Sequence, residues 1–365
     1  MIPYLILLIL PMIGSTGLIK LKNETNIFLL YSYLVLLIFF IGLRHEIGGD
    51  WDQYYYNYSS EAAKTSFSKF DFFYLGLRND YLYNLISFIF YNFGLSYHYV
   101  NFVLSIFFVI SIYKFAKIQP SVSLALVISF PIVIVIMGMG FTRQGAALSF
   151  VIFAFLEIIK KNKFNYCLFS LCAILFHKSS IFLLLMYPLL DNKIKLKNLI
   201  LALIIFLVFF YLLRQDLINL FHNYLGSNLS RNAENNTALK SHAAIIRVGL
   251  NLIASLIFLL FSKEICSERT ERKLFSILSF ICIISFFFIF KFNVFVDRFN
   301  YFIMPIQILV FSRFPFIFNN KDTILFFKLS ISFFYLFIFL IWANFSIHLD
   351  AWIPYNNIIF EWLKI

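Results

Sequence analysis

The chain has 365 residues, of which 61% are hydrophobic and only 13% are charged, and it carries a formal net charge of +12. A mean hydropathy of +0.85 excludes a soluble globular enzyme and predicts an integral membrane protein. No polar block is long enough to fold as a separate soluble domain. We therefore expect one all-α, polytopic domain covering residues 1–365, which needs no nucleic-acid partner.

Apolar runs recur from one end of the chain to the other and predict about twelve membrane spans. The expected spans lie near residues 2–19, 27–43, 97–113, 121–138, 144–159, 164–176, 178–190, 198–213, 243–262, 274–290, 299–316 and 323–343. Two choices complete this trace: residues 81–93 form an interfacial or re-entrant helix, and residues 164–190 form a hairpin with His177 at its tip. The lysine-bearing connections then all lie on one side, as is typical of cytoplasmic loops.

The outer loops of this trace lie near residues 44–80 and 214–242, and most arginines and all six histidines fall on the same outer side. A guanidinium group presents a rigid fork of donors that matches phosphate and carboxylate oxygens. Arginine held against the positive-inside bias therefore indicates an anionic ligand on the outer face. The alternative is that these arginines bind lipid headgroups or pair with acids in the loops.

The first outer loop begins with the segment "GLRHEIGGDWDQYYYNY", which contains Arg44, Asp50, Asp52 and Tyr54. Its Gly-Gly pair allows the two acids to turn back towards the membrane beside the arginine. Aromatic rings next to carboxylates are typical of sugar-binding sites, although an aromatic belt at the bilayer surface gives the same composition. The Asp-x-Asp spacing could hold a divalent cation, but we expect no metal and no cofactor.

Two motifs follow at predicted outer helix ends. In "TRQGAA", Arg143 stands at the entrance of a helix with small residues, and its burial calls for a partner such as Asp50, Asp297 or a substrate phosphate. In "FHKSSIF", His177 could accept a proton or bind phosphate, whereas many histidines beside a membrane are simply hydrogen-bonded core residues.

The C-terminal half adds further candidates. Arg247 lies several residues into a span, in "AIIRVGLN", where a charge usually faces the interior of the bundle. In "DRFNYF", Asp297 and Arg298 are adjacent, so each needs a partner elsewhere, and Tyr301 follows. Tyr355 belongs to "WIPYNN", a rigid aromatic corner that could cover the mouth of a site or anchor the tail in the interface.

The signature motifs of ATPases, zinc metalloproteases and serine hydrolases are absent from the sequence. Taken in order, "GLRHEIGGDWDQYYYNY", "TRQGAA", "FHKSSIF", "DRFNYF" and "WIPYNN" resemble the EpsG family of bacterial polysaccharide polymerases, which overlaps the Wzy-type O-antigen, capsule and exopolysaccharide polymerases. The resemblance implies a GT-C-like helix bundle in the bacterial cytoplasmic (inner) membrane, with its active site on the periplasmic or outer face. It leaves room for a chain-length regulator protein as a partner.

The activity that the resemblance implies is a glycosyltransferase reaction in polysaccharide or lipopolysaccharide biosynthesis. A growing glycan moves from undecaprenyl pyrophosphate onto the non-reducing end of another lipid-linked repeat unit, so donor, acceptor and membrane lipid are the expected partners. Arginines would stabilise the departing pyrophosphate, and a base would accept the proton of the acceptor hydroxyl. The expected phosphate ligands are Arg44, Arg143 and Arg298, with Arg247 in addition; the base candidates, in order, are Asp50, His177 and Asp297; Asp52, Tyr54, Tyr301 and Tyr355 complete the substrate site.

Three other functions fit a polytopic chain with these residues. A membrane O-acyltransferase also uses histidine and arginine within a helix bundle, and its loss would remove acetyl groups while sparing chain length. An O-antigen ligase would require a lipid A-core acceptor. A flippase for lipid-linked oligosaccharides would leave its substrate trapped on the cytoplasmic leaflet when deleted.

Overall fold

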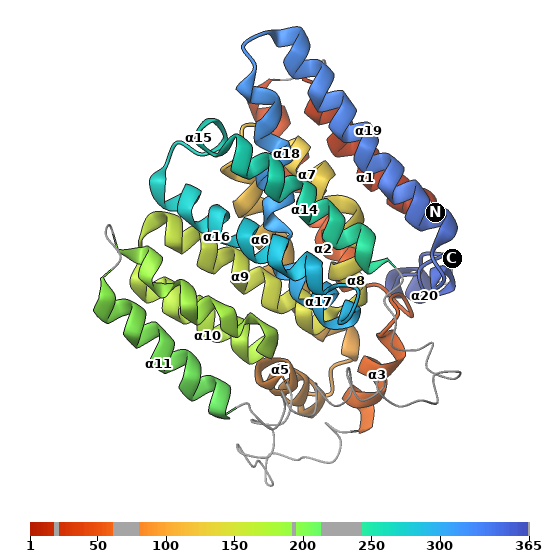
Figure 1. Ribbon diagram of the computed structural model, residues 1–365. Helices are drawn as coiled ribbons and strands as arrows, with labels where there is room; N and C mark the ends of the chain where they lie inside the picture. Colours follow the sequence, from red (N-terminus) through yellow and green to blue (C-terminus); the bar gives the residue numbers. More distant parts are fainter. Residues whose placement is uncertain (18–21, 61–79, 192–194, 213–242, 364–365) are drawn as a thin grey trace. The chain divides into compact units, whose positions relative to one another are not determined.

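The computed structural model describes residues 1–17, 22–60, 80–191, 195–212 and 243–363 (Figure 1). Within these ranges the regular secondary structure is helical, and the only β-type pairing is an isolated bridge between Arg44 and Asn357. The all-α class predicted from hydropathy is therefore confirmed. Most of both predicted outer loops, including residues 61–79 and 213–242, lies outside the described residues.

Five helices in the described part of the chain are long and apolar enough to cross a membrane. They are α2 (Asn23–Gly42), α6 (Tyr97–Lys117), the continuous stretch Val122–Gly140, α9 (Thr142–Lys160) and α19 (Lys321–Phe345). A pair of helices bent by 51°, Asn293–Ile303 and Pro305–Ile317, would make a sixth. The protein thus has the apolar helices of a multi-pass membrane protein, but the expected number of about twelve spans is not confirmed.

Several other predicted spans form shorter apolar helices of 10–17 residues. These shorter apolar helices are Ile2–Thr16, Lys163–Phe176, Lys178–Leu190, Leu196–Val208 and Ala244–Leu260. Hydropathy measures the length of an apolar run, whereas a span also requires an unbroken helix of about 20 residues.

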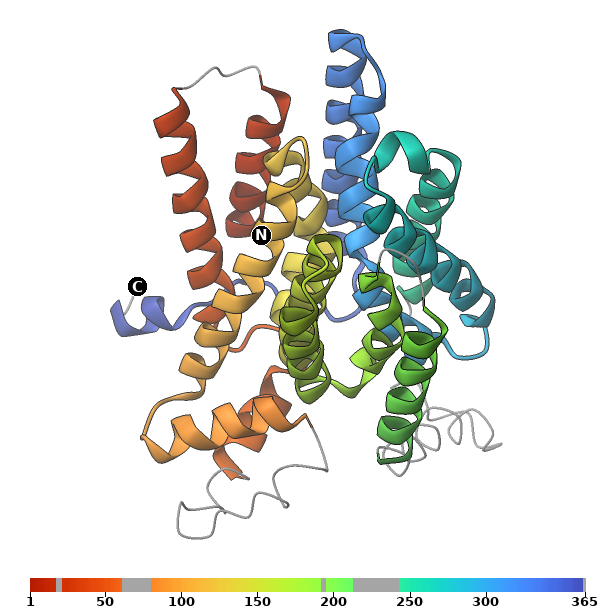
Figure 2. The ribbon, with the colours of Figure 1, turned by 90° about the vertical axis from the view of Figure 1, so that its left-hand side faces the viewer.

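The first of two compact units comprises residues 1–152, 175–177 and 311–365. In it, α2 packs along α6, and α1 (Ile2–Thr16) packs against α7 (Val122–Ser129) and α19. The hydroxyls of Ser15 and Ser332 lie 3.2 Å apart and join α1 to α19. Figure 2 shows α5 (Tyr81–Asn92, orange) lying across the lower ends of the upright helices, as an interfacial helix would. Further elements of this unit are α3 (Trp51–Ser60), η9 (Phe314–Ile317), η10 (Leu349–Ala351) and α20 (Ile358–Leu363).

The span Val122–Gly140 changes its helical geometry in the middle. After α7 the chain forms a π-helical segment, η3 (Phe130–Met137), and then the short α8 (Gly138–Gly140). Pro131 stands at the start of η3, where its ring and missing N–H interrupt the regular α-helical hydrogen bonds. One residue, Phe141, then separates α8 from α9, and its carbonyl accepts the N–H of Gly145 at 2.7 Å. This tight turn places Arg143 in the first turn of α9.

The second unit comprises residues 153–174 and 178–310. Its elements are α10 (Lys163–Phe176), the 3₁₀ helix η4 (Lys178–Leu190), α11 (Leu196–Leu212), α14 (Ala244–Leu260), α15 (Ser262–Ile265), α16 (Arg269–Phe288), α17 (Asn293–Asn300), η8 (Tyr301–Ile303) and most of α18 (Pro305–Arg313). α10 and η4 run antiparallel, because Lys163 Nζ lies 2.8 Å from Asp191 Oδ1 and the Tyr166 hydroxyl donates to the Leu183 carbonyl. The predicted hairpin at residues 164–190 is therefore confirmed.

Charged residues of the first unit sort to two opposite ends. Lys22 caps the start of α2, Lys117 ends α6 and Lys321 begins α19. Arg44 lies just beyond the opposite end of the 20-residue α2, about 30 Å from Lys22. Arg143 lies at the start of α9. Arg313, which also belongs to this unit, lies at the lysine end, where its Nε donates to Gln119 Oε1 at 2.7 Å, so the predicted separation holds for Arg44 and Arg143 but not for Arg313. That the arginine end faces outwards stays a prediction.

Gly48 fixes the path of the first loop. It has a φ of +112°, and a Cβ atom at this position would lie 2.4 Å from the carbonyl oxygen of Met139. Its N–H donates to the carbonyl of Ala351 at 2.7 Å. A side chain would disturb both the backbone conformation and this approach.

We expect Gly48→Ala to lower the free energy of unfolding by at least about 2 kcal/mol, because strain and a backbone collision add. Gly249→Ala is the matched control, since a Cβ there meets no atom within 4 Å. Thermal unfolding of the detergent-purified protein measures both. Equal melting temperatures for the two variants would show that the loop does not need this glycine.

Candidate functional site

Three segments that are far apart in the sequence meet at one end of the first unit. They are the loop after α2, the turn between α8 and α9, and the C-terminal tail. Backbone hydrogen bonds join the loop to the tail, from His45 N to Asn356 O at 3.2 Å and from Ile358 N to Leu43 O at 2.9 Å. The Trp352 ring lies so close to Gly140 that a Cβ there would be 2.8 Å from it. Three of the motifs singled out in the sequence thus form one structure.

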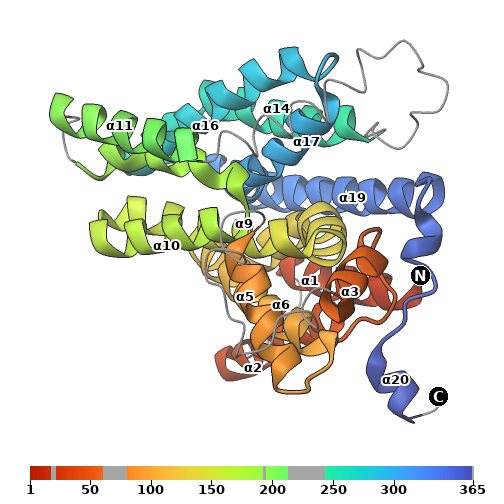
Figure 3. The same ribbon diagram turned by 90° about the horizontal axis from the view of Figure 1, so that it is seen from below.

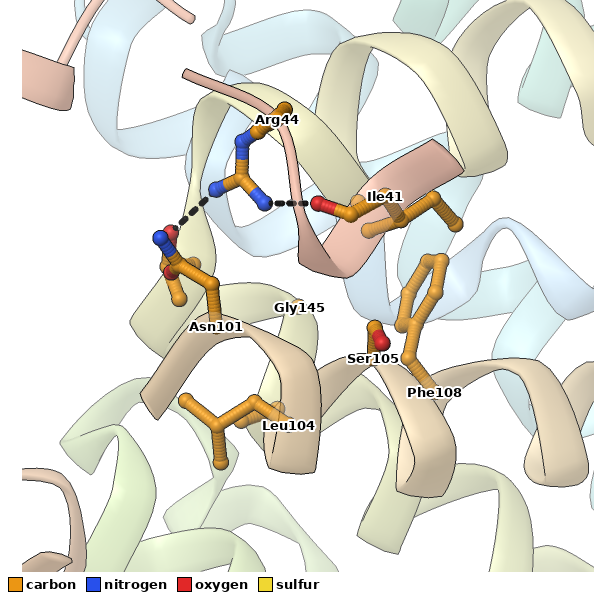
Figure 4. A pocket seen from close by; sticks show the side chains of 10 residues that line it. Ile41, Arg44, Asn101, Leu104, Ser105, Phe108 and Gly145 are labelled. Carbon is orange, nitrogen blue, oxygen red and sulfur yellow. Dashed lines mark hydrogen bonds between the residues drawn. The ribbon is translucent and has the colours of Figure 1, made fainter. Parts of the chain in front are cut away.

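Arg44 is the centre of this junction and is only 2% exposed. Its guanidinium donates to the carbonyl of Ile47 at 3.2 Å. It also donates to the carbonyl of Ile41 at 2.5 Å and to the hydroxyl of Thr142 at 2.8 Å (Figure 4). The ring of Trp51 lies 5.8 Å away. Burial lowers the pKa of Arg44, but an arginine side chain stays protonated at neutral pH.

No carboxylate of the described residues lies within ion-pair distance of Arg44. Its positive charge is instead balanced by the Ile41 carbonyl at the C-terminal end of α2, where the helix dipole is negative, and by the Ile47 carbonyl in the loop that follows. In this arrangement Arg44 holds the loop, α2 and the start of α9 together. Direct contact between Arg44 and a ligand stays a prediction.

A small cavity of about 10 Å³ lies beside Arg44. Its lining includes the polar residues Asn101, Ser105 and Thr142 and the apolar residues Ile41, Leu104 and Phe108. Figure 4 shows most of these side chains around Arg44. The Asn101 side chain is 1% exposed, and neither its amide nitrogen nor its oxygen has a hydrogen-bond partner among the described residues. Such a volume accommodates one water molecule and is far too small for a sugar or a diphosphate.

A second arginine lies nearer the surface. Arg143 Nη1 is 2.9 Å from Asp80 Oδ2, and the two side chains are 30% and 13% exposed. The guanidinium carbon lies 5.0 Å from the ring centre of Tyr54 and 6.0 Å from that of Tyr83. We call these four residues the Arg143 cluster. It combines a partly accessible cation with aromatic faces.

Aromatic residues continue from the Arg143 cluster towards the junction. The Tyr83 hydroxyl donates to the Tyr97 hydroxyl at 3.3 Å, and Trp51 lies 5.2 Å from the Tyr97 ring and 5.4 Å from the His98 ring. His98 Nε2 is in turn 2.9 Å from His45 Nδ1. Burial raises the pKa of Tyr83 well above its ordinary value, so its phenol keeps its proton. We call Trp51, Tyr54, Tyr83, Tyr97 and His98 the aromatic wall; they belong to α3, α5 and the start of α6, helices that lie near one another in Figure 3.

The second unit contains an ion pair of its own. Arg247 Nε donates to Asp297 Oδ1 at 2.9 Å, and Nη2 donates to Oδ2 at 2.6 Å. The side chains are 12% and 5% exposed, and the Arg247 guanidinium lies 5.6 Å from the Tyr301 ring centre. Next to this pair, Gln307 donates to Asn251 Oδ1 at 2.6 Å. Both oxygens of Asp297 are therefore engaged by one arginine, as its need for a partner outside its own helix predicted.

The remaining predicted site residues occupy different surroundings. Asp50 is half-buried just before α3, whereas Asp52 is exposed on α3. Tyr355 stacks on Phe40 with ring centres 4.2 Å apart and donates to the Phe40 carbonyl, which makes it part of the junction. Arg298 is half-buried.

His177 is half-buried between α10 and η4, at the break of the hairpin.

The first unit thus brings Arg44, Arg143, Tyr54 and Tyr355 to one end, and the second unit brings Arg247, Asp297 and Tyr301 together. Within the described part of the chain, no group of three or more histidine, cysteine, aspartate or glutamate side chains could hold a metal ion.

Asp80 is the functional candidate that the sequence interpretation missed. The sequence pointed to Asp50, Asp297 or a substrate phosphate as the partner of Arg143, and the structure gives Asp80 instead. A usable signal was its place directly before the helix that begins at Tyr81, because aspartate is favoured at the N-terminal cap of a helix.

Removing one member of the Arg247–Asp297 pair should be more harmful than removing both. We expect Arg247→Met to lower the free energy of unfolding by about 3–5 kcal/mol, because it leaves the Asp297 carboxylate buried and unpaired. Combining it with Asp297→Leu should restore most of that loss. Chemical denaturation of the three purified variants is the measurement.

A double variant that is no more stable than Arg247→Met would contradict this account of the pair. A double variant that is stable but inactive would assign the pair to substrate binding as well as to packing.

Comparison with known proteins gives one finding. The model of the EpsG family matches residues 26–357, which is most of the chain. Neither the curated proteins nor the solved structures contain a match.

Proposed function

Because the chain belongs to the EpsG family, as its motifs indicated, we propose that it is a polysaccharide polymerase that uses undecaprenyl pyrophosphate as the carrier of its donor. Family membership supports the polymerase role, and the apolar helices fit a multi-pass membrane protein. The GT-C-like fold, the bacterial inner membrane and the outer-face active site are parts of the same proposal.

The Arg143 cluster is the observation that supports this proposal most strongly. Of the three arginines whose contacts are described above, Arg44 is held by carbonyls and Arg247 by both oxygens of Asp297. Arg143 keeps 30% of its side chain exposed and makes one ion pair. Its guanidinium is therefore the one best placed to meet an incoming anion.

In the proposed reaction, an acceptor hydroxyl at the non-reducing end of one lipid-linked unit attacks the anomeric carbon of the growing chain. The bond from that carbon to the diphosphate breaks, and negative charge develops on the diphosphate. A guanidinium positioned by Tyr54 and Tyr83 would stabilise this charge more strongly in the transition state than in the ground state. The tyrosine rings offer stacking surfaces for the sugars, and the apolar helices offer a path for the polyprenyl chain.

The other predicted residues have supporting roles in this proposal. Arg44 and Tyr355 hold the loop and the tail in place, and Arg298, in the second unit, stays a predicted phosphate ligand. Asp52 contacts sugar hydroxyls from α3. Asp50 and His177 remain candidate bases, whereas Asp297 would first have to leave Arg247.

We expect Arg143→Ala to insert and express normally but to lower kcat by about 10²–10³-fold, as loss of a charge-stabilising group does. Cells with this variant should carry single repeat units in place of long chains on a glycan gel. Arg143→Lys should recover part of the activity, since it keeps the charge but not the fork. Arg269→Ala is the matched control, because Arg269 is exposed at the lysine-bearing start of α16.

An unchanged ladder of chain lengths in the Arg143→Ala strain would contradict the polymerase proposal. Loss of acetyl groups with normal chain length would favour an acyltransferase. A strict requirement for a lipid A-core acceptor would favour a ligase, and lipid-linked units trapped on the cytoplasmic leaflet would favour a flippase.

A further inference from the structure

Asp80 occupies an unusual position for the residue that starts a helix. It is the N-terminal cap of α5, yet its side chain makes no capping hydrogen bond to that helix, and its φ is +39°. Aspartate at this position normally accepts an N–H from the first turn, and a left-handed backbone is unfavourable for a residue with a Cβ atom. Instead, the carboxylate reaches Arg143 at 2.9 Å. Asp80 thus lacks both the capping hydrogen bond and the backbone conformation that are usual at this position, and its carboxylate binds Arg143 instead.

The contact uses the group that a diphosphate would need. Asp80 Oδ2 accepts from Nη1 of Arg143, the guanidinium we assign to the donor's diphosphate. A diphosphate carries more negative charge and more acceptor oxygens than a carboxylate, and guanidinium binds phosphate in a bidentate manner. The diphosphate of the lipid-linked substrate and the Asp80 carboxylate therefore compete for the same N–H groups of Arg143. Binding of the donor would leave Asp80 Oδ2 without its arginine.

A carboxylate released in this way is suited to a second task. It lies at the edge of the Arg143 cluster with 13% of its side chain exposed, beside the rings of Tyr54 and Tyr83 on which sugars could stack. An oxygen that no longer accepts from Arg143 can accept the proton of a hydroxyl within hydrogen-bond reach. The release happens only when the diphosphate is in place, so the base would act only when a donor is present.

Resting on the proposed function, we propose that Asp80 is the general base of the glycosyl transfer and that Arg143 holds it until the donor's diphosphate displaces it. The acceptor hydroxyl oxygen bonds to the anomeric carbon, and its proton passes to the Asp80 carboxylate. The bond between the anomeric carbon and the diphosphate breaks, and its electron pair leaves with undecaprenyl pyrophosphate. Asp80 then returns the proton to water.

The test uses the full-length protein, purified in detergent, with Asp80→Asn and Asp80→Glu. Binding of undecaprenyl pyrophosphate and turnover of lipid-linked repeat units are measured separately. Glu24→Gln is the matched control, because Glu24 is an exposed carboxylate at the opposite, lysine-bearing end of α2.

Asp80→Asn should bind undecaprenyl pyrophosphate several-fold more tightly, because a competitor for Arg143 has been weakened, while kcat falls by about 10²-fold or more. Asp80→Glu keeps the carboxylate, so its binding should stay close to wild type and kcat should recover at least about tenfold over Asp80→Asn. A residue that merely braced the site would instead weaken binding and turnover together.

Weaker binding by Asp80→Asn, or a kcat within about threefold of wild type, would overturn the inference. If Asp80→Asn does not fold, Asp80→Glu provides the test. A wild-type kcat together with weaker binding of undecaprenyl pyrophosphate by Asp80→Glu would also overturn the inference. Wild-type protein that makes no polymer at all would refute the proposed function itself, which is a separate outcome.

Discussion

A guanidinium group that lies among apolar helices must be matched by a negative partner, because leaving it unpaired costs several kcal/mol. The three arginines described at atomic detail meet this constraint in three different ways. Arg44 is matched by one helix-end carbonyl, one loop carbonyl and a hydroxyl, Arg247 by both oxygens of Asp297, and Arg143 by one oxygen of Asp80. The nature of the partner then decides what else each arginine can do. Backbone carbonyls cannot leave, and a buried bidentate pair separates with difficulty, whereas a single ion pair at a partly exposed edge can be exchanged for another anion.

This constraint also explains why the first loop and the C-terminal tail are built together. The carbonyls that surround Arg44 belong to the end of α2 and to the loop, and the loop is fixed in turn by the tail through Gly48 and Ala351. Tyr355 satisfies another carbonyl at the end of α2. The motifs at both ends of the chain therefore form the frame on which the Arg143 cluster rests. In the proposed polymerase, that frame would hold the aromatic wall still while long glycans pass over it.

Part of this organisation could be predicted from the sequence. Hydropathy was sufficient for the helical class, and the lysine pattern was sufficient for the hairpin at His177 and the short helix at residues 81–92. The number of spans could not be predicted in the same way, because the breaks that shorten these helices depend on packing. The role of Arg44 could not be predicted because its hydrogen-bond acceptors are mostly backbone carbonyls, and every residue type carries a backbone carbonyl. The pairing of Arg143 with Asp80 was hidden because it joins two helices that are distant in the sequence.

The central claim is that Arg143 exchanges a carboxylate for the diphosphate of a lipid-linked donor. A cryo-electron microscopy structure of the protein with undecaprenyl pyrophosphate bound tests it most directly. The account predicts phosphate oxygens within hydrogen-bond distance of the Arg143 guanidinium and an Asp80 carboxylate that has moved off it. A diphosphate bound elsewhere, with the 2.9 Å contact between Arg143 and Asp80 intact, would contradict it.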